Sequence, residues 1–106
     1  MSTSYRRYEI LLPRRFNDGR SVPPRLIEET LIELRRKFGP TSRETQTIQG
    51  HWQHQSEIYH DLSVRVFVDV EDIAANRDFF LGFKKRLRQQ FEQFDIYMTS
   101  HPIEVL

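Results

Sequence analysis

Residues Ile58 to Val70, IYHDLSVRVFVDV, alternate between apolar and polar side chains along almost their whole length. The positions that share one side are Ile58, His60, Leu62, Val64, Val66, Val68 and Val70. Successive side chains of a strand point to opposite faces, so this period of two predicts a long β-strand with one buried face. The sheet that contains it should then have one covered side and one open side.

The residues before this strand predict its hairpin partner. Residues 44–53 form a polar segment that suits a strand at the edge of a sheet. A three-residue loop, His54 to Ser56, would pair Trp52 with Ile58 and set apolar residues opposite one another. A two-residue loop would set Ile48 opposite a polar side chain, so we expect the longer loop, although a bulge near Tyr59 to Asp61 would change this register by one.

Two further strands and two helices are predicted around the hairpin. The strands are 8–12 and 95–100. The first helix begins near Pro23 and Pro24, with Ser21 or Val22 close to its cap, and the second is 74–93, with Asp72 or Asn76 as its cap. Each helix has apolar residues at intervals of three or four, namely Ile27, Leu31, Leu34 and Phe38, then Phe80, Phe83, Leu87, Phe91 and Phe94. Gly39 and Pro40 end the first helix, because proline does not continue a helix and glycine accepts the left-handed conformation.

The order of these elements predicts the fold class. Strand, helix, strand, strand, helix and strand follow one another within one domain, residues 1–106. This order is typical of an α+β ferredoxin-like βαββαβ sandwich. With two right-handed crossovers, the four-stranded antiparallel sheet would have the order 4-1-3-2 and two helices on one face.

Composition narrows the classes of function. Sixteen basic and 15 acidic residues give a net charge of +1, which argues against a general binder of polyanions. The charge is uneven, however, with +4 in residues 1–25, −2 in 26–70 and −1 in 71–106. There is no cysteine, so disulfides and thiolate sites are excluded. No signal-peptide pattern and no run of about 20 apolar residues occurs, so we expect a soluble, cytoplasmic protein.

Four segments also resemble a known group of proteins. They are GHWQHQSEIYHD at 50–61, VRVFVDV at 64–70, NRDFFLGFKKRL at 76–87 and QFDIYMTSHPIEVL at 93–106. They look like those of small bacterial proteins of about this length with no assigned function. The resemblance implies a bacterial origin and carries no activity or functional residue with it.

The richest cluster of reactive side chains lies in the hairpin, where His51, Tyr59, His60 and Asp61 are weak candidates for catalysis. Imidazole and carboxylate groups can bind a metal or transfer protons. In the expected register, however, His60 shares the core face with the apolar residues, whereas the other three lie on the far face. A polar hairpin without a site is therefore the favoured interpretation, and we expect no metal and no cofactor.

The open side of the sheet predicts self-association. It should carry Leu11, Arg65 and Phe67, with Glu9 and Tyr97 beside them. A contiguous face that mixes large apolar groups with charges often marks an interface. We therefore expect a homodimer or a larger homo-oligomer, with room for a small-molecule ligand between the sheets.

Arginines predict two further possibilities. Arg14, Arg15 and Arg20 flank a turn at 17–19 and could bind an anion, since arginine suits carboxylate and phosphate groups. RNA binding is less favoured, because 64–70 lacks the Gly-aromatic pattern of RNA-recognition modules and the basic run 84–88 lies on the helix side.

The sequence thus favours an oligomerising or ligand-binding module. A small enzyme with a cavity near the hairpin is the first alternative, and an RNA-binding module is the second.

Overall fold

The computed structural model describes the backbone of residues 4–40, 42–54 and 57–106, and the side chains of 4–40 and 63–106. Its elements in chain order are β1 (Tyr5–Pro13), α1 (Pro24–Phe38), β2 (Ser42–His54), β3 (Glu57–Glu71), α2 (Ala74–Gln90) and β4 (Met98–Ile103). The order of strands and helices is the one that the sequence predicts.

The strands form an antiparallel sheet with the hydrogen-bonded order β2-β3-β1-β4. β1 lies between β3 and β4, with Ile10 opposite Val66 on one side and opposite Met98 on the other. The alternation of side chains then gives the sheet two different faces. One face is buried beneath the helices and consists mainly of Tyr8, Ile10, Leu12, Val66, Val68 and Val70.

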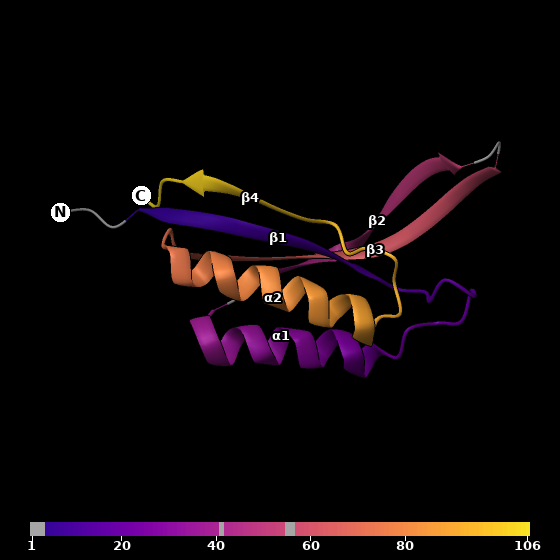
Figure 1. Ribbon diagram of the computed structural model, residues 1–106, viewed down its shortest axis with the longest axis horizontal. Helices are drawn as coiled ribbons and strands as arrows, with labels where there is room; N and C mark the ends of the chain where they lie inside the picture. Colours follow the sequence, from indigo (N-terminus) through magenta and orange to yellow (C-terminus); the bar gives the residue numbers. More distant parts are fainter. Residues whose placement is uncertain (1–3, 41, 55–56) are drawn as a thin grey trace.

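The two helices lie side by side on this face (Figure 1). Their apolar stripes pack against it in one core cluster. Pro24 begins α1, where its missing N–H lacks an intrahelical partner in any case. Gly39 follows the last turn at φ 90°, and its N–H donates to the carbonyl of Arg35. From α2, the Phe80 ring stacks on Tyr8 at a centroid distance of 3.9 Å, which joins the helix layer to the sheet.

The predicted ferredoxin-like sandwich, with four strands lying under two helices, needs correction. β1 pairs with β3 only between Ser63 and Glu71, so the region with β1 in the middle is β3-β1-β4, and only residues 42–48 of β2 lie beside it, on the far side of β3. The rest of β2, residues 49–54, pairs with residues 57–62 of β3, in an arm that reaches beyond the helices (Figure 1). A register shift between Arg43 and Thr47 interrupts the β2–β3 pairing before this arm begins.

The predicted hairpin register is also wrong. Trp52 lies opposite Tyr59 rather than Ile58, and His54 lies opposite Glu57, so the strands are joined by two residues rather than three. Apolar pairing across a hairpin decides register only where a core covers one face. The pairs in question lie beyond the helix layer, so that rule had little force there.

The end of α2 differs from its prediction too. The helix ends at Gln90 instead of residue 93, and β4 begins at Met98 instead of residue 95. Phe91 closes the core, whereas Phe94 is 87% exposed and does not belong to the apolar stripe. No side chain caps the first turn of α2. Asp72 pairs with Arg6, and the Asn76 side chain donates to the carbonyl of Glu71.

Candidate functional site

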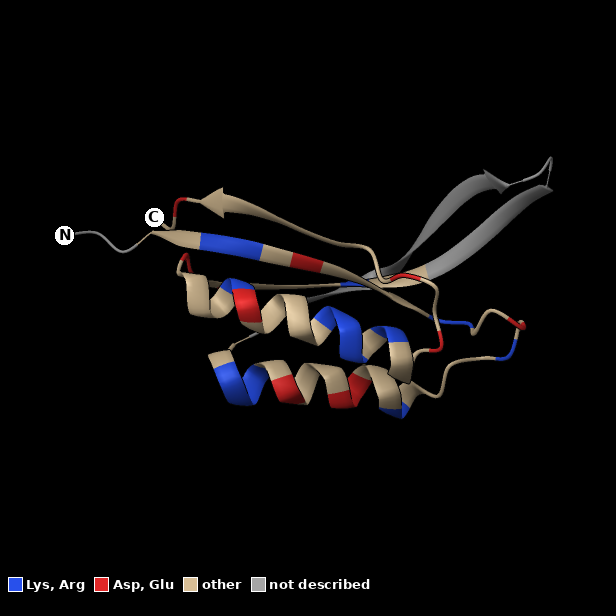
Figure 2. Cartoon of the chain, viewed as in Figure 1, with Lys and Arg blue, Asp and Glu red and all other residues tan. Residues whose placement is uncertain are grey.

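The sheet face turned away from the helices carries a regular grid of polar and aromatic side chains. Strand pairing arranges them in three rows, Arg65–Leu11–Tyr97, Phe67–Glu9–Thr99 and Asp69–Arg7–His101, with each β1 residue in the middle. We call these nine residues the open face. Figure 2 shows basic and acidic segments close together along β1, the central strand.

Two ion pairs cross the open face. Arg7 donates to both carboxylate oxygens of Asp69, from Nε at 2.8 Å and from Nη2 at 3.1 Å. Arg65 likewise donates to both carboxylate oxygens of Glu9, from Nε and from Nη2. The four side chains are only 21–32% exposed, so water screens these pairs less than it screens pairs on a fully exposed surface.

Phe67 lies beside both arginines. Its ring centroid is 4.3 Å from Cζ of Arg7 and 5.0 Å from Cζ of Arg65. The face of an aromatic ring attracts cations, so the ring and the two carboxylates together fix both guanidinium groups. The open face therefore presents charged groups in defined positions.

The charges set the protonation of Glu9. The hydrogen bond from Arg65 holds the pKa of this carboxyl below its usual range, and the positive charges of Arg65 and Arg7 act in the same direction. The hydrogen bond to Asp69 likewise raises the pKa of Arg7. Glu9 is thus an ionised acceptor at neutral pH, and Arg7 is an ionised donor.

The structure brings together the four residues that the sequence singles out for an interface. Leu11, Arg65 and Tyr97 share one row, and Phe67 lies in the next. Tyr97 is 66% exposed. Whether these residues meet a second copy stays a prediction.

Sequence reasoning missed four members of the open face, Arg7, Asp69, Thr99 and His101. The same period of two contains the signal, since Arg7 lies two residues from Glu9, and Asp69 lies two residues from Phe67. His101 could not be placed on the open face from the sequence, because the predicted last strand ended at residue 100 whereas β4 continues to Ile103.

The catalytic candidates of the hairpin lie where only the backbone is described. His51 is opposite His60, and Gly50 is opposite Asp61. The side chains of His51, Tyr59, His60 and Asp61 are outside the described set, so their predicted role stays open. Among side chains of 4–40 and 63–106, no three His, Asp or Glu groups could hold a metal ion.

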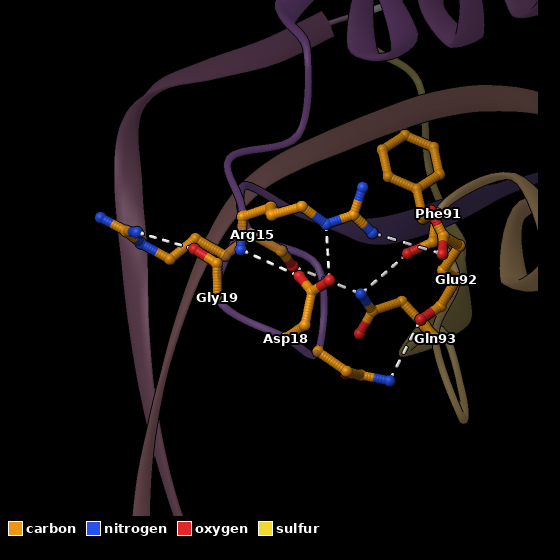
Figure 3. Close-up of polar contacts among 8 residues, drawn as sticks. Arg15, Asp18, Gly19, Phe91, Glu92 and Gln93 are labelled. Atoms are coloured by element: carbon orange, nitrogen blue, oxygen red, sulfur yellow. Dashed lines mark hydrogen bonds and ion pairs between the residues drawn. The ribbon is translucent and has the colours of Figure 1, made fainter.

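The segment of the predicted anion site is a loop whose residues contact Glu92 and Gln93, just after the end of α2 (Figure 3). Arg15 donates to the carbonyl of Gly19, and Arg20 pairs with Asp18 and Glu92. The Gln93 side chain donates to the carbonyls of Arg15 and Phe91. Two of the three predicted arginines thus have partners within the chain, and Arg14 has a contact as well. Anion binding here stays untested.

The basic run 84–88 is partly neutralised. Lys84 lies 3.3 Å from Asp95, and Arg86 pairs with Glu33 of α1. These pairs link α2 to its surroundings and reduce the positive charge available to a polyanion. No helix in the described part of the chain has the length and hydropathy needed to cross a membrane.

Comparison with known proteins identifies the fold. No family model and no curated protein matches the chain, so the resemblance to small bacterial proteins stays a prediction. Among solved structures, the chain is similar to a phage SAM lyase in complex with S-methyl-5'-thioadenosine. The TM-score is 0.67 at 14% identity, over 99% of this chain and 93% of that one. A phage SAM lyase in the apo state matches with a TM-score of 0.60 at 16% identity, over 94% and 80% of the two chains. The fold is therefore α+β and like that of a SAM lyase.

Proposed function

We propose that the protein is a small enzyme that cleaves a sulfonium nucleoside, with S-adenosylmethionine as substrate and the open face as the binding surface. The observation that supports this most is the fold likeness, which spans 99% of this chain and 93% of a phage SAM lyase. The likeness covers nearly the whole of both chains rather than a shared fragment. Because one fold can serve many functions, the proposal also needs a site, and the open face is the candidate.

The reaction defines what such a site must do. To release S-methyl-5'-thioadenosine, the bond between the sulfonium and the four-carbon amino-acid chain must break. The electron pair goes to sulfur, which becomes a neutral thioether. The carbon fragment either closes on its own carboxylate or loses a proton to a base. Neither route consumes water or a second substrate, so the main task of the protein is to bind and orient the substrate.

The side chains of the open face suit this task. Tyr97 offers aromatic surface for a purine, Phe67 holds the arginines in place, and the ion-paired arginines and carboxylates offer partners for an amino-acid group. A carboxylate directly at the sulfur would stabilise the sulfonium more than the transition state, in which the positive charge is disappearing. We therefore expect Glu9 and Asp69 to lie away from the sulfur.

The test is to incubate the purified protein with S-adenosylmethionine and follow S-methyl-5'-thioadenosine by chromatography. We expect the product to accumulate in proportion to time and protein. Phe67→Ala should lower the rate, whereas Phe94→Ala, which removes an exposed aromatic ring outside the open face, should not. Absence of product together with absence of substrate binding would refute the proposal. Retention of single-stranded RNA at low salt in that case would favour the RNA-binding alternative.

We also propose that the chain self-associates through the open face. Leu11, Phe67 and Tyr97 provide apolar surface there, and the ion pairs between them provide alternating charge. Sedimentation velocity at micromolar concentration should give a dimer or a larger closed oligomer. Tyr97→Asp, which places an extra charge on this face, should shift the protein towards monomer. A strict monomer for the unmodified chain would overturn this part of the proposal.

A further inference from the structure

Arg7 has hydrogen-bonding capacity on the open face that its ion pair does not use. A guanidinium carries five N–H groups, and Arg7 donates to Asp69 from Nε and Nη2. Its Nη1 takes part in no hydrogen bond with the residues whose side chains the structure describes. The side chain is 30% exposed, so these donors can reach a ligand on the sheet.

The same guanidinium is held in place before any ligand arrives. Asp69 accepts two hydrogen bonds from one edge of it, and the ring centroid of Phe67 lies 4.3 Å from its central carbon, Cζ. A flexible arginine loses side-chain entropy when it binds an anion. An arginine that is already fixed loses less, and so contributes more to affinity.

The neighbours of Arg7 add a negative charge beside its positive one. His101 lies directly opposite Arg7 across the β1–β4 pairing. Glu9 lies two residues along β1 on the same face, at a spacing of about 7 Å along the strand. Donors for an anion therefore lie next to an ionised carboxylate, an arrangement that complements a zwitterion such as the α-amino-acid group.

We propose that Arg7, with His101 beside it, binds the α-carboxylate of the amino-acid end of the substrate, and that Glu9 faces the ammonium group. This inference rests on the proposed function, because it takes S-adenosylmethionine as the substrate. It assigns the two ends of that molecule different positions on the sheet. The purine end, and the product S-methyl-5'-thioadenosine, make no use of Arg7.

The test compares two thioethers that lack the sulfonium charge and that the enzyme does not cleave. S-adenosylhomocysteine retains the amino-acid end, and S-methyl-5'-thioadenosine lacks it. Calorimetric titration of Arg7→Met should show about 10- to 100-fold weaker binding of S-adenosylhomocysteine, the loss expected for a charge-assisted contact. Binding of S-methyl-5'-thioadenosine should change less than about twofold.

A matched control lies one residue away. Arg6 has a similar exposure of 24% and a comparable ion pair, with Asp72 at 3.0 Å, but it projects from the other side of β1. Arg6→Met should leave the binding of both thioethers unchanged. Arg7→Lys, which keeps the charge for Asp69 without the planar fork, provides the test if Arg7→Met does not fold.

The outcomes separate the inference from the function on which it rests. If the unmodified protein binds neither thioether, the proposed function fails and the inference fails with it. If it binds both, and Arg7→Met weakens both equally or neither, the assignment of Arg7 is wrong while the function stands. Only a selective loss of S-adenosylhomocysteine supports the assignment.

Discussion

Glu9→Gln is expected to destabilise the fold in a way that depends on pH. The substitution removes a carboxylate that accepts two hydrogen bonds from Arg65, where the two side chains are 26% and 21% exposed. Exposed ion pairs contribute about 0.2–1 kcal/mol, and hydrogen bonds to charged groups about 1.5–3 kcal/mol. Partial burial places this pair between the two, so we expect a loss of about 1–1.5 kcal/mol at pH 7.

The direction of the pH dependence follows from the lowered pKa of Glu9. In the folded protein this carboxyl stays ionised to a lower pH than in the unfolded chain, where the pKa of a glutamate is about 4.3. The stabilisation is therefore complete above that value. It disappears as the pH falls through the lower pKa of the folded state. The difference between the parent protein and Glu9→Gln should shrink accordingly below about pH 4.

Urea denaturation at pH 7 and at pH 3 measures both effects. With a slope of about 2 kcal/mol per molar urea, the midpoint should move by about 0.5–0.8 M at pH 7 and by much less at pH 3. Glu104→Gln, which removes an exposed carboxylate after β4, is the matched control and should not move it. An equal shift at both pH values, or no shift at pH 7, would refute the reasoning.

Two further predictions concern the end of α2 and the end of α1. Phe91 is fully buried and Phe94 is 87% exposed, so Phe91→Ala should cost about 3–5 kcal/mol and Phe94→Ala less than about 0.5 kcal/mol in the same urea experiment. Similar losses for the two variants would contradict the observed helix end. Gly39→Ala should cost about 1 kcal/mol, because φ is 90° although no atom would obstruct the new Cβ. A more stable Gly39→Ala variant, measured by thermal unfolding, would argue against that backbone conformation.

The features that the sequence predicted well are those that a core enforces. The alternation of 64–70 and the stripe from Ile27 to Leu34 both face the same buried layer, and both elements lie where the patterns indicate. The extent of the sheet under the helices and the hairpin register were wrong. Neither is decided by burial, because residues 49–54 of β2 pair with residues 57–62 of β3, beyond the helices.

The site was predicted in part for a related reason. Leu11, Phe67 and Tyr97 attract notice as apolar groups on an open sheet, whereas Arg7 and Asp69 are ordinary charged residues until the register sets them opposite one another. His101 joined the site only because β4 continues to Ile103, three residues beyond the predicted end of the strand. Boundaries and registers that depend on long-range pairing carry little local signal.

The ion pairs of the open face also bear on the energetics of covering it. An isolated charge that moves out of water loses its hydration, and a second surface must then compensate for that loss. On this face each carboxylate already has its arginine, and each arginine already lies against Phe67. Much of that dehydration has therefore occurred when the single chain folds. A flat molecule or a second protein surface that binds to the sheet would displace only the remaining water. A highly charged face can therefore also be one whose dehydration on binding costs little free energy.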